Sequence, residues 1–139
     1  MVKHTPTKKV SKEKYSSFVQ VADGFAEAAK VAREFDYPNA AGVLIIHSVI
    51  AYADALTIKK AGLKCKGENH YEVISLLSDK MPFTAERQKA LDHFSALISH
   101  KNMISYHGQI YTKGDVSKLF KHAERFIDWA RLNLGQKEI

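Results

Sequence analysis

Apolar residues recur every three or four positions along most of the chain, which is the spacing of one face of an α-helix. On this basis we predict four principal helices, over residues 11–35, 39–61, 84–107 and 112–134, and a short helix near residues 70–79. The connections between them are short, and short connections favour antiparallel neighbours. The predicted fold is therefore all-α, an antiparallel up-and-down four-helix bundle with an extra short helix.

Three of the predicted helix starts carry capping residues. Asn39 can cap the second helix and Thr84 the fourth, because short polar side chains accept hydrogen bonds from the free N–H groups of a first turn. Thr112 and Asp115 have the spacing of a capping box at the start of the last helix. Gly62 is predicted to end the second helix.

The most apolar run, residues 40–58, is nearly long enough to cross a bilayer. His47, Ser48 and Asp54 interrupt it, and an unpaired carboxylate at mid-membrane costs roughly 2.5–3.5 kcal/mol on insertion scales. The basic start of the chain leads into no apolar stretch, so no signal peptide is visible. We therefore predict a central core helix, a cytoplasmic protein and no membrane partner.

Composition agrees with one globular domain, since 45% of the 139 residues are hydrophobic and 26% are charged. The formal net charge is +6, and residues 1–14, with five lysines and one glutamate, contribute +4 of it. A second basic cluster comprises Lys59, Lys60, Lys64 and Lys66. Basic runs attract phosphate backbones, although a solvated tail and loop would look the same. We assign residues 1–10 to a basic flexible tail and residues 11–139 to a single helical domain.

Metal and thiol chemistry are not favoured. His93, His100 and His107 are seven residues apart, a rise of about 10 Å per step, so they are too far apart to share a metal ion. We expect no metal site and no cofactor. The neighbouring lysines of the single cysteine, Cys65, favour its thiolate, but the sequence identifies no partner base, so an incidental thiol is the alternative.

Two polar residues of the apolar run, His47 and Asp54, share a face of the predicted helix about two turns apart. Buried polar groups need hydrogen-bond partners. Two interpretations stay open: a structural network, or orienting groups beside a polar pocket.

The end of the fourth helix carries the most suggestive chemistry. Its core stripe consists of Leu91, Phe94 and Ile98. Lys101 takes the next place on that stripe, and burying an ammonium group is costly, so we expect the helix to open a polar site there. On a straight helix Lys101 and His107 lie about 120° and 9 Å apart, so they would not meet within one chain. A position at the helix end suits His107 as a general acid.

The run Lys101-Asn102-x-x-x-Tyr106-His107, placed just before the last helix of an all-helical domain, resembles the motif of the HEPN family (higher eukaryotes and prokaryotes nucleotide-binding domains). The family motif is an Arg, four to six residues and a His, often with a polar residue after the Arg. Here Lys takes the place of Arg, and the resemblance extends over roughly residues 11–134.

The resemblance implies a homodimer in which two copies of the motif face one cleft, acting as a metal-independent endoribonuclease. An RNA 2′-OH would attack the adjacent phosphate. His107 would then move the proton, Lys101 would neutralise the phosphoryl charge and Asn102 would position the pair, while Ser105 and Tyr106 would help to bind the substrate.

Three functional classes remain open. The first is a ribonuclease of toxin or defence type. The second is a non-catalytic module that binds nucleotides or a nucleotidyltransferase partner, because Lys101 lacks the planar fork of Arg. Within a toxin subgroup of the family, a Tyr that such a partner modifies stands where this chain has Gln109. The third class is a helical scaffold with no nucleic-acid role.

Overall fold

The computed structural model describes residues 6–67 and 69–135. In these residues the main elements follow one another as β1 (Thr7–Lys9), the 3₁₀ turn η1 (Lys12–Lys14), α1 (Tyr15–Glu34), α2 (Pro38–Ala61), β2 (Leu63–Cys65), α3 (Tyr71–Lys80), α4 (Ala85–Tyr106) and α5 (Lys113–Leu134). The all-α bundle with an extra short helix is confirmed.

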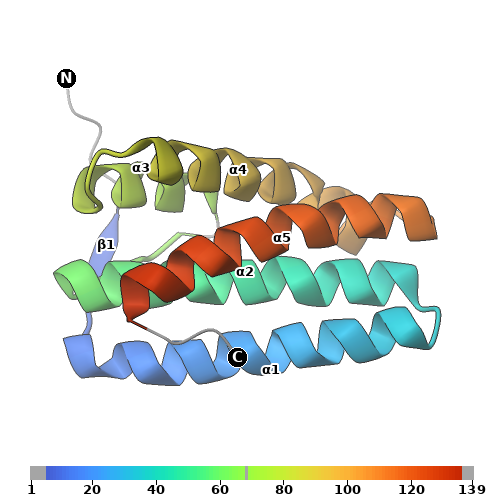
Figure 1. The fold of residues 1–139 in the computed structure, drawn as a ribbon, viewed down its shortest axis with the longest axis horizontal. Helices are drawn as coiled ribbons and strands as arrows, with labels where there is room; N and C mark the ends of the chain where they lie inside the picture. The colour runs from blue at the N-terminus through green and yellow to red at the C-terminus, as the bar shows by residue number, and fades with distance from the viewer. Residues whose placement is uncertain (1–5, 68, 136–139) are drawn as a thin grey trace.

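The long helices alternate in direction along the chain (Figure 1). Helix α2 lies at the centre and packs against α1, α3, α4 and α5, while α5 also packs against α4. Figure 1 places α1 on one side of α2, and α3 and α4 on the other. The largest completely buried side chains are Tyr52, Phe94, Phe126, Ile46, Leu56, Ile58, Leu77, Leu97, Leu119 and Leu134.

Helix α2 is long and apolar enough to cross a membrane, but 83% of its apolar window is buried inside the bundle. It is a core helix, which is consistent with a soluble protein. Its polar groups have partners: the Ser48 hydroxyl donates to the Ala22 carbonyl of α1 at 2.7 Å, and the Tyr52 hydroxyl donates to Asp23. Arg131 of α5 also donates to Asp23, at 2.7 Å, so this carboxylate links three helices.

The predicted caps at the last two long helices are confirmed. The Thr84 hydroxyl accepts from the Arg87 N–H at 3.0 Å, and Thr112 and Asp115 form the reciprocal capping box. Asn39 does not cap α2, which begins at Pro38. Proline suits a first helical position because it has no N–H to satisfy there. The Asn39 amide instead donates to the Gln109 carbonyl at 2.7 Å.

The structure departs from the prediction of a flexible tail over residues 1–10. Thr7–Lys9 form a strand that pairs antiparallel with Leu63–Cys65, and Lys8 lies opposite Lys64. This two-stranded ribbon could not be predicted, because each strand is three residues long, too short for a period-2 pattern. Residues 1–5 lie outside the described part of the chain, as do residues 136–139 at the end of the predicted domain.

Gly62 makes the turn between α2 and the ribbon, with a φ of 65°. Its carbonyl accepts from the Val10 N–H at 2.8 Å, and a Cβ there would lie 3.2 Å from the Val10 carbonyl oxygen. We expect Gly62→Ala to lower the free energy of unfolding by about 1–2 kcal/mol, because non-glycine residues are strained in the left-handed region.

Urea unfolding followed by circular dichroism measures this effect. Gly24→Ala is the matched control: Gly24 lies within α1, and a Cβ there meets nothing within 4 Å. That control should gain about 0.5–1 kcal/mol from helix propensity. Equal effects of the two substitutions would show that the turn at Gly62 carries no conformational demand.

Candidate functional site: a polar groove between α2, α3 and α4

A cavity of about 680 Å³ opens where α2, the start of α3 and the end of α4 meet. We call it the polar groove, and its lining residues are His47, Asn69, His70, Tyr71, Ile98, Lys101, Asn102 and Tyr106. Three segments that are far apart in the sequence therefore contribute to one site. The groove is lined by three residues of the run 101–107 described above, Lys101, Asn102 and Tyr106, together with His47 from the core helix α2.

The end of α4 is held against α2 by close packing. Gly42 of α2 is buried, and a Cβ at that position would overlap the Cδ1 atom of Ile104. The absence of a side chain thus lets α4 approach α2 closely, one turn from Lys101. Asn39 also fixes the connection after α4, because its side-chain oxygen accepts from the Tyr111 N–H at 2.8 Å.

Lys101 is half-buried in the groove, and its ammonium nitrogen lies 5.9 Å from the centroid of the Tyr106 ring. The predicted exit of α4 from the core is observed here, since Phe94 and Ile98 are buried and Lys101 lines a cavity. A cation over an aromatic face is favourable, so the two side chains support each other's placement. Within the described residues, no carboxylate lies within ion-pair distance of Lys101.

His47 is the titratable group from α2 in the groove. Burial, and secondly the positive charge of Lys101, hold the pKa of His47 below its usual value. Its ring also lies 5.8 Å from that of Phe25 on α1. The imidazole is therefore neutral near pH 7 and can accept a proton at that pH.

Two exposed tyrosines flank the groove. Tyr71 at the start of α3 is 46% exposed and Tyr106 at the end of α4 is 74% exposed. Asn69 shapes the turn before α3, because its side-chain oxygen accepts from the Tyr71 N–H at 3.1 Å. Exposed aromatic faces beside a cation are a common arrangement for stacking nucleobases.

His107 and Ser105 do not line the groove. His107 follows the last residue of α4 and is exposed, and Gly108 beyond it has a φ of 68°, as predicted for a helix stop. Ser105 is half-buried one turn away from Lys101. Within one chain, the structure thus places His107 outside the cavity that Lys101 lines.

Asp54 also lies elsewhere. It is buried on α2 and forms an ion pair of 3.8 Å with Lys64 of β2. Burial raises the pKa of this carboxyl to about 6, and the nearby Lys64 offsets only part of the effect. Of the two residues taken as a structural network or as orienting groups beside a polar pocket, only His47 lines the groove, whereas Asp54 pairs with Lys64.

The surroundings of Cys65 disfavour its thiolate. Cys65 is buried, and burial, followed by the charges of Asp54 and Glu72, raises the pKa of its thiol to about 11. Neighbours in sequence suggested a thiolate, but the surroundings in space have the opposite effect.

The two histidines within α4 do not line the groove: His93 contacts α5, and His100 contacts the connection between α4 and α5. His93 Nδ1 lies 2.9 Å from His122 Nδ1, and His100 Nδ1 lies 2.7 Å from the Tyr111 hydroxyl. Among the described residues, no group of three or more His, Cys, Asp or Glu side chains could hold a metal ion.

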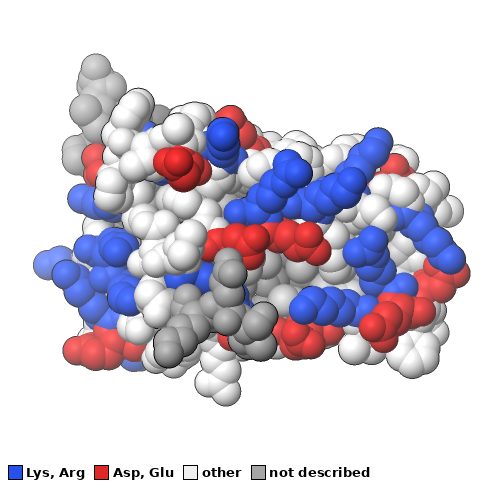
Figure 2. Space-filling view, viewed as in Figure 1, with Lys and Arg blue, Asp and Glu red and all other residues white. Residues whose placement is uncertain are grey.

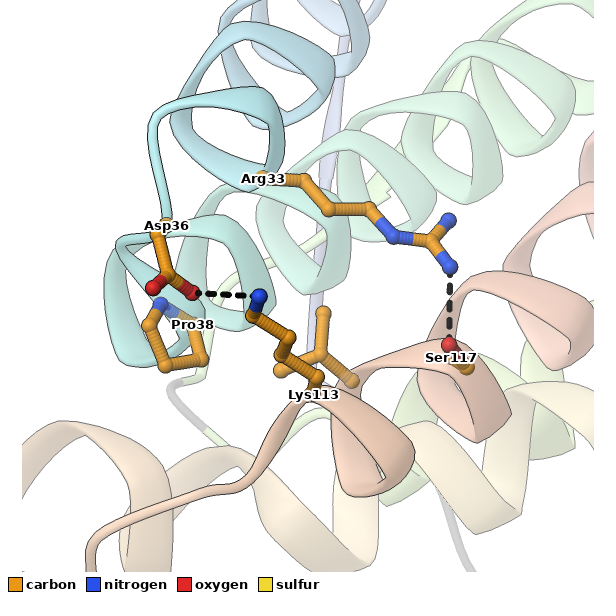
Figure 3. A pocket seen from close by; sticks show the side chains of 6 residues that line it. Arg33, Asp36, Pro38, Lys113 and Ser117 are labelled. Atoms are coloured by element: carbon orange, nitrogen blue, oxygen red, sulfur yellow. Dashed lines mark hydrogen bonds and ion pairs between the residues drawn. The ribbon is translucent and has the colours of Figure 1, made fainter.

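A smaller cavity of about 240 Å³ lies where the α1–α2 turn meets the start of α5 (Figure 3). Its cations already have partners: Arg33 donates to the Ser117 hydroxyl at 2.8 Å, and Lys113 lies 3.6 Å from Asp36. Figure 3 shows both interactions crossing the cavity. A phosphate would have to compete with these contacts, so the polar groove is the better candidate for an anion site.

Sequence reasoning missed Asn69, His70, Tyr71 and Ile98 as groove residues. Ile98 has the spacing of an ordinary core position, and residues 69–71 (Asn-His-Tyr) form no recognisable motif with their neighbours in the sequence. Only the packing of α3 beside α4 places the run opposite Lys101.

No protein-family model matches this sequence, and no curated protein shows a significant match to it.

Proposed function

We propose that this chain is a HEPN-like protein that binds RNA through a phosphate in the polar groove and cleaves it without a metal ion. One observation carries the proposal: Lys101, Asn102 and Tyr106 line the same cavity as the neutral imidazole of His47. A cation, an amide and a proton acceptor are the groups that phosphodiester cleavage by an internal nucleophile requires.

In the proposed reaction, His47 takes the proton from a ribose 2′-OH, and the 2′-oxygen attacks the adjacent phosphorus. Lys101 balances the charge that develops on the phosphoryl oxygens, and Asn102 donates a hydrogen bond to them. The bond to the 5′-oxygen breaks, and His107 gives a proton to this leaving group. The products are a 2′,3′-cyclic phosphate and a free 5′-hydroxyl.

A homodimer is part of the proposal. His107 is exposed at the helix end and outside the groove of its own chain, so a second copy would supply it across a two-fold axis. Tyr106 and Ile110, which flank His107, are 74% and 82% exposed and would be covered in such a contact. Light scattering should then give about twice the 15.6 kDa chain mass.

Cleavage of a single-stranded RNA in excess EDTA tests the proposal. We expect products that end in a 2′,3′-cyclic phosphate, and no cleavage where a 2′-deoxy nucleotide replaces the ribose before the scissile phosphate. Cleavage of the deoxy substrate, or dependence on added Mg²⁺, would contradict the proposed chemistry. The proposal also places the protein in the cytoplasm, in a toxin or defence role.

The second candidate is a non-catalytic HEPN module that binds nucleotides or a nucleotidyltransferase partner. It is favoured by the Lys at position 101, which cannot grip two phosphate oxygens as an Arg fork does. Tyr71 and Tyr106 still offer faces for a base. This candidate predicts nucleotide binding that Lys101→Gln abolishes, with no RNA turnover. A scaffold without a nucleic-acid role predicts neither binding nor turnover.

A further inference from the structure

The pairing of β1 with β2 brings the lysines of residues 8–14 next to those of residues 59–66 at one end of the bundle. We call this surface the lysine end, and it comprises Lys8, Lys9, Lys12, Lys14, Lys59, Lys60, Lys64 and Lys66. Besides the β1–β2 pairing, the Lys66 N–H donates to the Pro6 carbonyl at 3.0 Å. Figure 2 shows Lys and Arg side chains crowded at the end of the molecule where Figure 1 places β1.

Two of these lysines are used within the fold. Lys59 donates to the Leu134 carbonyl at 2.5 Å, and its ammonium lies 4.6 Å from the Tyr15 ring centroid. Lys64 pairs with Asp54. The other six are exposed, and none forms an ion pair within 4.0 Å with any described residue. Glu13 is the acidic residue of segments 6–14 and 59–67.

Repulsion between these lysines destabilises the pairing of β1 with β2. Lys8 stands directly opposite Lys64 in the ribbon, and like charges opposite each other destabilise an antiparallel pair. The ribbon has only three residue pairs, so it gains little from packing of its own. A bound polyanion would turn this repulsion into attraction.

The surroundings favour a soluble polyanion over a membrane surface. Membrane-surface binding combines basic residues with large apolar side chains that enter the lipid. None of the large hydrophobic residues exposed in the described structure belongs to segments 6–14 or 59–67. The surface therefore has the charge for an anionic partner without the apolar residues that lipid would require.

We propose that the lysine end binds the phosphate backbone of nucleic acid without sequence preference. The proposal goes beyond the function of the polar groove, because none of these eight lysines lines it. Each neutralised phosphate of a single strand contributes about 0.7 to the slope of log affinity against log salt concentration. Four lysines engaged in this way account for a slope of roughly 3.

The test compares two variants of the full chain with equal loss of charge. The lysine-end variant combines Lys8→Gln, Lys9→Gln, Lys12→Gln and Lys60→Gln. The control variant combines Lys30→Gln, Lys113→Gln, Lys118→Gln and Lys121→Gln, which lie on α1 and α5 away from the ribbon. Fluorescence anisotropy measures binding of a mixed-sequence RNA of about 20 nucleotides, from about 50 to 300 mM salt.

We expect the lysine-end variant to bind at least about 10-fold more weakly at the lowest salt and to lose a slope of roughly 2–3, while the control loses less than about 1. Equal losses in the two variants would overturn the proposal, because net charge alone would then explain them. Wild-type binding by the lysine-end variant would overturn it too, as would binding to anionic vesicles but not to RNA.

The outcome is separable from that of the proposed cleavage. If the wild type cleaves no RNA but the two variants differ in salt slope, only the ribonuclease proposal fails. If the wild type cleaves and the two variants bind alike, only the lysine-end proposal fails. Lys101→Gln should leave the slope difference between the two lysine variants in place.

Discussion

His107→Ala is expected to slow metal-free RNA cleavage by about 10²–10⁴-fold, the usual contribution of one positioned proton donor or acceptor. The leaving 5′-oxygen would otherwise depart as an unstable alkoxide. Because His107 transfers its proton to the leaving group only in the transition state, this substitution should leave RNA binding by the groove within about twofold. Single-turnover rates and anisotropy on the same RNA measure the two effects.

His47→Gln is the companion variant, with a different signature. His47 must be neutral to accept the 2′-OH proton, so the wild-type rate should rise with pH along an acidic limb that lies below the range of an ordinary histidine, because the pKa of His47 is lowered. In this variant the cleavage rate should fall by about 10²-fold or more, and the rise of the rate with pH should disappear. Glutamine keeps the polar side chain in its half-buried site but cannot take a proton.

Three further substitutions test the assignment of these roles. Lys101→Arg should retain cleavage or increase it, because the guanidinium keeps the charge and adds a second donor, whereas Lys101→Gln should remove cleavage. His93→Ala is the control histidine, since His93 contacts His122 on the α5 side of α4. Unchanged cleavage in His107→Ala, or equal losses in His93→Ala and His107→Ala, would remove the site assignment.

The second large effect is a pH dependence of stability that arises at Asp54. Burial raises the pKa of its carboxyl from its ordinary value near 3.8 to about 6 in the folded chain. The folded state therefore binds the proton more tightly than the unfolded state, and stability falls as pH rises between these two values. At 1.36 kcal/mol for each pKa unit the complete loss is about 3 kcal/mol, and about 2.5 kcal/mol of it falls between pH 4 and pH 7.

The comparison of wild type with Asp54→Asn isolates this contribution, because asparagine has no proton to release. Urea unfolding between pH 4 and pH 7 should show wild type losing about 2.5 kcal/mol relative to the variant as pH rises. A flat difference would mean that Asp54 is as well solvated in the fold as outside it. A gain of wild-type stability with pH would mean that the Lys64 ion pair outweighs burial.

The pH dependence expected for the cleavage rate and that expected for stability both arise from one feature of α2, a helix that is buried almost all round and still carries polar groups. His47 emerges into the groove, whereas Asp54 stays buried beside the ribbon. The same burial lowers the pKa of the first group and raises that of the second, because it disfavours the charged form of each.

The helices themselves could be predicted from the sequence, because their signals are local. A capping box needs residues three apart, such as Thr112 and Asp115, and the stop at Gly62 needs one residue that tolerates a positive φ. The exit of α4 from the core could be predicted because Lys101 occupies a position on the apolar stripe of that helix. The polar character of the α4 end was visible for the same reason.

The predictions that failed depended on contacts between segments that are distant in the sequence. Asn39 has the chemistry of a cap but bonds to the connection after α4, and Cys65 has basic neighbours in sequence but acidic ones in space. Residues 7–9 look like a tail until Leu63–Cys65 pairs with them. Periodicity cannot report such pairings, because it records only the spacing within one element.

The sequence by itself determined the all-helical class, most helix ends and the polar end of α4, since each depends on residues within a turn or two of one another. Only the tertiary structure decided which polar groups share a site: it brought His47, Asn69 and Lys101 to one groove and Lys8 beside Lys64. The physical reason is that burial and charge environment are properties of packed surfaces, and residues far apart in the chain create those surfaces.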